Sequence, residues 1–162
     1  MPRPDTSPTM PSASKFLDYG TTPPQEPPQD MPMADEHAPI RVLVVDDDHL
    51  VADSLALIVR GRGFESRAVY SGEDAAEVAL TWKPDAVIAD VIMGKLDGVA
   101  LAAYLTEVLP SCKVLLISGN LDAAEMMNAS NKPGHTFPLL AKPVHPDHIF
   151  EFLGSSTYEA SN

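Results

Sequence analysis

The sequence predicts an α/β domain with a parallel five-stranded sheet covered by helices on both faces. Two observations support this fold class. Short apolar runs with the length of buried strands alternate five times with segments whose apolar residues recur at helical spacing. The runs consist mainly of β-branched and aliphatic residues, which is typical of strands covered on both sides. Right-handed crossovers between such strands place helices on both faces of the sheet.

The first predicted strand, residues 41–45, leads directly into three consecutive acids, Asp46, Asp47 and Asp48. Apolar residues at helical spacing between positions 50 and 58 predict a helix, which an Arg-Gly-Arg-Gly segment closes. The acids therefore occupy a strand-to-helix turn. We interpret Asp48 as the N-cap of the helix rather than as a metal ligand.

Two further strand and helix units follow. Residues 64–70 predict the second strand, and Ser71 opens a capping-box pattern at the start of the next helix. The third buried strand ends in a carboxylate, Asp90. Asp97 is the predicted N-cap of a helix that Pro110 stops.

The last strands are shorter or less regular. Residues 113–117 predict the fourth strand, and residues 122–128 a helix with a thin apolar face. Residues 137–141 predict the fifth strand, and a short helix then runs from Pro146 to Leu153.

Composition divides the chain into three parts. Residues 1–39 hold ten of the 16 prolines and no long apolar periodicity, which predicts a disordered proline-rich arm. Residues 40–153 are predicted to form the folded domain, and residues 154–162 a flexible tail.

Charge and apolar content exclude several classes of partner. The net charge of −12 argues against direct binding of nucleic acid, because no basic stripe is available to displace counterions. No uncharged apolar stretch reaches membrane-spanning length, so membrane insertion is not expected. The single cysteine, Cys112, excludes an internal disulfide and receives no role. These observations predict a cytoplasmic protein.

Polar side chains follow the predicted strands at the edge where parallel strands end together, namely Asp46, Asp47, Asp90, Ser118 and Lys142. Clustered carboxylates repel one another by about 4 kcal/mol per pair at ~4 Å and an effective dielectric constant near ~20. Mg²⁺ relieves such repulsion and prefers oxygen ligands, while the ammonium and the hydroxyl suit a phosphoryl group. No serine or cysteine has an evident partner base, so we predict a carboxylate nucleophile, Asp90, with Asp46 and Asp47 holding the metal.

Four motifs in this order resemble the receiver domain of two-component response regulators over residues 40–153. The motifs are Val44-Val45-Asp46-Asp47, Asp90 at the third strand end, Ser118-Gly119 after the fourth strand, and Lys142-Pro143 after the fifth. The resemblance implies a flavodoxin-like, doubly wound sheet of strand order 2-1-3-4-5.

The resemblance also implies a mechanism. Asp90 would accept a phosphoryl group from a sensor histidine kinase or a histidine phosphotransfer protein. Asp47, Asp90 and the backbone carbonyl of Ile92 would bind Mg²⁺, for which Mn²⁺ can substitute. Asp46 would act through a metal-bound water.

The remaining motifs match residues that hold and report the phosphoryl group. Ser118, Gly119 and Lys142 correspond to the phosphoryl-binding and switch positions of the family, and Pro143 to a proline that follows a cis peptide bond.

The chain departs from the family at two places. Gly94 stands where a proline is common, which loosens the loop beside Asp90. Leu139 stands where many members carry an aromatic switch residue, and Phe137 fits a core residue better than a substitute for it.

Two positions flanking the site, Ile92 and Asn120, match positions that often tune how water attacks the acyl phosphate in the family. Ile92 cannot orient a water molecule by hydrogen bonding, so we predict a longer-lived phosphoryl state than in members with a polar residue there.

We expect a stand-alone regulator rather than an enzyme, which signals to an unknown protein target or serves in a phosphorelay. The face around the fourth helix, the fifth strand and the last helix is the expected output surface and a candidate homodimer interface.

Alternatives remain open at this point. Asp46-x-Asp48 also fits a haloacid-dehalogenase-like phosphatase, although the further acidic motif that such enzymes need is missing after Lys142. A receiver-like module that is never phosphorylated is another reading. His145 and His148 fit solvated surface residues better than a metal pair. The pair Met126-Met127 is either a partner surface or helix filler.

Overall fold

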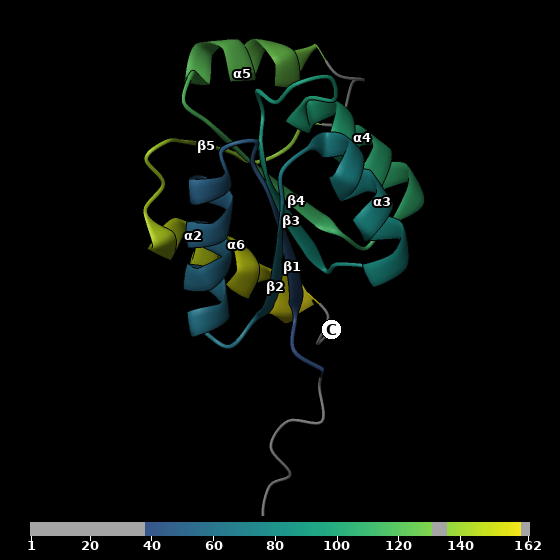
Figure 1. Ribbon diagram of the computed structural model, residues 1–162, viewed down its shortest axis with the longest axis vertical. Helices are drawn as coiled ribbons and strands as arrows, with labels where there is room; N and C mark the ends of the chain where they lie inside the picture. Colours follow the sequence, from purple (N-terminus) through teal and green to yellow (C-terminus); the bar gives the residue numbers. More distant parts are fainter. Residues whose placement is uncertain (1–37, 131–135, 160–162) are drawn as a thin grey trace, which may run out of the picture. The chain divides into compact units, whose positions relative to one another are not determined.

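Five parallel strands form one sheet in the order β2-β1-β3-β4-β5 (Figure 1). The computed structural model describes residues 38–130 and 136–159. The strands are β1 (Arg41–Val45), β2 (Glu65–Val69), β3 (Ala86–Asp90), β4 (Lys113–Ser118) and β5 (Leu139–Ala141). The flavodoxin-like order 2-1-3-4-5 is thus confirmed.

A helix follows each strand along the chain. The helices are α2 (His49–Gly61), α3 (Gly72–Trp82), α4 (Gly98–Val108), α5 (Leu121–Ala129) and α6 (Pro146–Glu159). In Figure 1, α2 and α6 lie on the opposite side of the sheet from α3 and α4. The sheet is therefore doubly wound, as its alternating sequence pattern predicts.

Each face of the sheet has its own apolar core, because successive strand residues point to opposite faces. Leu43 and Val45 belong to the core under α3 and α4. Val42 and Val44 belong to the core under α2 and α6. All four side chains are fully buried. Helices thus cover both faces of the sheet, and the carboxyl ends of the strands remain accessible.

Four helices begin at a residue whose side chain accepts a hydrogen bond from a backbone N–H of the first turn. The capping residues are Asp48 for α2, Ser71 for α3, Asp97 for α4 and Asn120 for α5. The predicted caps at Asp48, Ser71 and Asp97 are confirmed. Each cap anchors the loop that leads from a strand end into the next helix.

β5 begins at Leu139, two residues later than predicted. The backbone N–H of Phe137 donates to Asn128 Oδ1 at 3.1 Å, and its carbonyl accepts from Asn128 Nδ2 at 2.8 Å. Pro138 has no N–H to donate to a ladder. The segment before β5 is thus held at Phe137 by a buried side chain of α5 and at Pro138 by β4, where the Leu116 N–H donates to the Pro138 carbonyl.

The ends of the chain differ in part from the predicted boundaries. α6 continues beyond Leu153 to Glu159, which corrects the predicted start of the tail at residue 154. A glycine inside a helix is unfavourable by only about 1 kcal/mol, so Gly154 does not end it. Residues 1–37 of the predicted arm lie outside the described residues. None of the helices in the described ranges is long and apolar enough to span a membrane.

Candidate functional site

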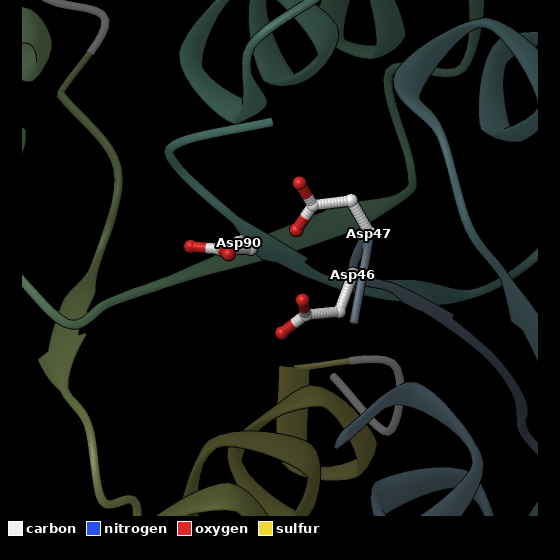
Figure 2. A group of neighbouring side chains, drawn as sticks. All are labelled: Asp46, Asp47 and Asp90. Carbon is white, nitrogen blue, oxygen red and sulfur yellow. The ribbon is translucent and has the colours of Figure 1, made fainter. Parts of the chain in front are cut away.

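Three carboxylates gather at the carboxyl ends of β1 and β3 (Figure 2). Asp46, Asp47 and Asp90 each offer an oxygen within 4.8 Å of the others. Asp46 and Asp90 are buried, whereas Asp47 is exposed. β1 and β3 are paired neighbours in the sheet, which is why residues more than forty positions apart meet. The predicted acidic cluster is therefore present.

Lys142 joins the cluster from the end of β5. Its Nζ lies 2.7 Å from Asp46 Oδ2 and 3.2 Å from Asp90 Oδ2. A backbone hydrogen bond from the Lys142 N–H to the Ser118 carbonyl, 2.8 Å long, aligns it with β4. One ammonium thus bridges two buried carboxylates, and an ion pair of this kind is more favourable than either charge buried alone.

The local environment shifts the pKa of both partners. Burial raises the pKa of Asp90, and repulsion from Asp46 adds to this, while Lys142 and the Ile92 N–H lower it without cancelling the effect. Burial lowers the pKa of Lys142, but hydrogen bonds and attraction from Asp46 and Asp90 outweigh it, so the net shift is upward. Lys142 therefore remains charged beside a carboxylate that ionises reluctantly.

Ser118 lies at the end of β4 and is buried, but its hydroxyl is engaged locally. The Oγ donates to the Asn120 carbonyl at 3.0 Å and accepts from the Asn120 N–H at 3.1 Å. Gly119, between them, is exposed. The bond between Lys142 and Pro143 is cis, as the resemblance implied.

The loop from Asp90 to α4 is packed closely against the site. The Ile92 N–H donates to Asp90 Oδ1 at 3.4 Å, and the Ile92 side chain is 51% exposed. A Cβ added at Gly98 would overlap the backbone carbonyl of Asp90. Around Gly94, in contrast, there is open space. No pattern in the sequence indicates that the α-carbon of Gly98 faces the Asp90 carbonyl.

An apolar groove of about 500 Å³ adjoins the acidic cluster. Leu50 and Val51 of α2 line one side, and Pro143 and Val144 line the other. Lys142 lines the groove as well, so groove and cluster share this ammonium. Leu50 is 76% exposed. The strand ends therefore open onto an apolar surface that the sequence did not reveal.

Several other residues considered in the sequence are not part of the cluster. Phe137 and Leu139 pack against the core beneath α3 and α4, which supports the core interpretation of Phe137. His145 and His148 are exposed, with ring centroids 6.2 Å apart. Burial raises the pKa of Cys112 to about 12, so its thiol stays protonated at neutral pH.

A family model described as the response regulator receiver domain matches residues 42–153. This match spans well over half of the chain. The strand order and the acidic cluster agree with it. The chain belongs to the receiver domain family of response regulators.

Two curated relatives are considerably longer than the region that matches this chain. The transcriptional regulatory protein GlrR of Escherichia coli (strain K12) is 26% identical over 125 residues, which are 77% of this chain and 28% of GlrR. The response regulator MprA of Mycolicibacterium vanbaalenii is 31% identical over 87 residues, 54% of this chain and 38% of MprA. The chain therefore matches only a minor part of each relative's length.

Solved receiver domains have the same fold. The CheY-like receiver domain from Methylobacillus flagellatus is 25% identical, with a TM-score of 0.62, and the match covers 74% of this chain and 99% of that one. The CheY-like receiver domain from Methanospirillum hungatei JF-1 is 19% identical, with a TM-score of 0.66 and coverage of 75% and 96%. The latter similarity concerns the fold alone.

Substitution of Gly98 tests the close packing beneath Asp90. Gly98→Ala should destabilise the protein by about 1–3 kcal/mol, because the new methyl group must displace the Asp90 carbonyl or the start of α4. Urea unfolding measures the change. Gly94→Ala is the matched control and should have a much smaller effect, and equal losses in both variants would contradict the packing argument.

The raised pKa of Asp90 predicts a dependence of stability on pH. The folded chain holds the Asp90 proton more tightly than the unfolded chain, so this carboxyl lowers stability as pH rises above its ordinary pKa range. In metal-free buffer, Asp90→Asn should therefore be more stable than the wild type at neutral pH. This advantage should shrink towards about pH 3.5.

Urea unfolding at both pH values measures this effect. Glu77→Gln, an exposed change on α3, is the control and should show no such dependence on pH. An advantage of Asp90→Asn that is equal at both pH values would contradict the assignment.

Proposed function

We propose that Asp90 accepts a phosphoryl group from a histidine kinase or a histidine phosphotransfer protein. The observation that carries this proposal is the contact of Lys142 Nζ with both Asp46 and Asp90 at the strand ends. A carboxylate needs no base to act as a nucleophile, and an ammonium beside it can pair with phosphoryl oxygens. Membership of the receiver family supports the same role.

The donor set of the acidic cluster fits Mg²⁺. Three carboxylates and one ammonium leave two negative charges, which suit a hard divalent cation that prefers oxygen ligands. Within the described ranges, no side chain or backbone N–H donates to the exposed Asp47 carboxylate. Asp47, Asp90 and the Ile92 carbonyl would hold the ion directly, and Asp46 through water. Mn²⁺ shares the preference for oxygen and can substitute.

The reaction is a transfer between two nucleophiles. An oxygen of the Asp90 carboxylate forms a bond to phosphorus while the bond from phosphorus to the imidazole nitrogen of the donor breaks, and its electron pair stays on that nitrogen. The product is an acyl phosphate. Lys142 would pair with the phosphoryl oxygens, and the bound cation would neutralise part of their charge.

Ser118 is the residue that must rearrange after transfer. Its hydroxyl donates to the Asn120 carbonyl, and this bond must break before it can donate to a phosphoryl oxygen. Asn120 is also the N-cap of α5, so the change would reach α5 without an aromatic residue at Leu139. We infer that signalling uses the surface of α5, β5 and α6, which is also the predicted homodimer interface.

The apolar groove beside Lys142 supports a docking site for the phosphodonor. A helix that carries the phosphohistidine could place apolar residues against Leu50 and Val144 while its imidazole reaches Asp90. The groove is continuous with the acidic cluster, because Lys142 belongs to both.

Several further predictions from the sequence stay predictions. They are the stand-alone organisation, the cytoplasmic location, the lack of direct nucleic-acid contact and the lack of catalytic turnover. The phosphatase alternative gains no support from Asp48, whose carboxylate accepts from the N–H groups of Leu50 and Val51 as a helix cap. An unphosphorylated module is disfavoured because Lys142 and the acids meet.

Incubation with acetyl phosphate and Mg²⁺ tests the phosphoacceptor. Intact-mass measurement should show one added phosphoryl group on the wild type and none on Asp90→Asn. Asp48→Asn retains a capping side chain and should behave like the wild type, and chelation of Mg²⁺ should abolish the addition. Addition to Asp90→Asn would refute the assignment, and sustained release of phosphate would favour the phosphatase.

The side chain at position 92 should control the lifetime of the acyl phosphate. Ile92 is half-exposed beside Asp90 and cannot orient water through a hydrogen bond. Ile92→Asn should therefore shorten the lifetime several-fold, whereas Ile92→Val should leave it nearly unchanged. Decay of the phosphorylated mass over time measures both, and a wild type that decays as fast as Ile92→Asn would contradict this expectation.

A further inference from the structure

A second groove, of about 490 Å³, lies between α4 and α5, away from the apolar groove beside Lys142. The residues that line it are Asp97, Val99, Ala100, Met126, Met127 and Ser130. Met126 is 73% exposed, although it is a large apolar side chain, and Met127 packs partly against the core. Met126 differs from other exposed apolar side chains such as Leu57 in that it lines a groove, and a groove that binds a helix needs apolar side chains in its lining.

Among the described residues, the one charged side chain that lines this groove is acidic, and further acids lie on the helices beside it. Asp97 is the charged residue among those that line it. Asp122 lies one helical turn before Met126 on the same side of α5. The only charged residues of α4 and α5 are acids, Glu107 on α4 and Asp122 and Glu125 on α5. The apolar floor is thus bordered by negative charge.

We propose that this groove binds a short amphipathic helix of a partner protein through an apolar stripe and flanking basic residues. The apolar stripe would lie against Met126 and Met127, whose unbranched side chains adapt to different partners. Basic residues would face Asp97 and Asp122. α5 has nine residues and is therefore ~13 Å long, which matches two to three turns of a partner helix.

Charge excludes the other simple occupant, a second copy of this chain. In a two-fold symmetric contact the same surface meets itself, so both copies would bring Asp97 to the contact and the described lining of neither groove would supply a basic residue. Like charges brought together in this way oppose association. The partner is therefore basic.

The two helices that line the groove, α4 and α5, each begin after a loop that contacts residues of the acidic site. On the α4 side, Gly98 follows Asp97 and packs against the Asp90 carbonyl. On the α5 side, Asn120 caps the helix and bonds to Ser118. A change at Asp90 would therefore reach both walls. This link to phosphorylation rests on the proposed function, whereas the groove is present without a phosphoryl group.

A designed peptide provides the test. The probe is a fluorescein-labelled peptide of leucine and lysine with leucines at i, i+3, i+4 and i+7, and its control has the same composition in scrambled order. Fluorescence anisotropy with the full chain, without phosphodonor, measures binding. Met126→Gln removes the apolar contact, and Asp122→Asn removes a flanking charge. Leu57→Asn is the matched control, because Leu57 is 66% exposed on α2.

The groove predicts that the patterned peptide binds and that the scrambled one binds much more weakly. Met126→Gln should weaken binding roughly five- to tenfold, and Leu57→Asn should not. Asp122→Asn should weaken binding and reduce its dependence on salt. Equal binding of both peptides, or equal effects of Met126→Gln and Leu57→Asn, would overturn the proposal, since either result indicates attraction by net charge alone.

The link to phosphorylation is measured separately. Acetyl phosphate and Mg²⁺ are added to the wild type and to Asp90→Asn, and intact mass reports phosphorylation in the same samples. A change in peptide affinity confined to the phosphorylated wild type supports the link. Unchanged affinity at full phosphorylation overturns the link and leaves both the groove and the phosphoacceptor in place.

Discussion

The ion pair between Lys142 and the carboxylates of Asp46 and Asp90 is the interaction on which the rest of this structure depends. Both carboxylates are buried, with relative exposures of 1% and 7%. Two buried like charges without a counter-charge would be strongly unfavourable. The Lys142 ammonium, at the end of β5, supplies this counter-charge to both carboxylates. The parallel direction of the strands makes this contact possible, because it brings the carboxyl ends of β1, β3 and β5 to the same end of the sheet.

Lys142 directly follows β5, which is only a three-residue edge strand. β4 holds it from one side, where the Leu116 N–H donates to the Pro138 carbonyl at 2.8 Å. Asn128 holds the preceding residue from the other side with two hydrogen bonds. The Lys142 ammonium can therefore be positioned accurately although β5 is short. Hydrogen bonds from β4 and from the Asn128 side chain fix the residues before the strand.

Two grooves lie at different places on the domain, and of these two the first shares Lys142 with the acidic cluster. One lies between α2 and the segment after β5 and is apolar up to Lys142. The other lies between α4 and α5 and is bordered by acids. Their different chemistry would suit the two proposed partners, an apolar helix of the phosphodonor at the first groove and a basic amphipathic helix at the second. The hydrogen bonds between Ser118 and Asn120 lie between the acidic cluster and α5. They connect the cluster to α5 through polar groups, although Leu139 stands where many receivers have an aromatic residue.

Local features of the sequence determined the element order, the two-sided burial of the strands, three helix caps and the acids and lysine at the strand ends. These features depend on near neighbours, since strand and helix periodicity and capping act over a few residues. The family resemblance added the strand order and the cis bond before Pro143.

Only the tertiary structure decided where distant groups meet. Lys142 lies 96 residues from Asp46, yet it is closer to that carboxylate than to Asp90. The contact of Gly98 with the Asp90 carbonyl, the hold of Asn128 on Phe137 and the two grooves arise in the same way. The physical reason is that side-chain packing between separate elements sets these distances, and no local pattern in the chain encodes them.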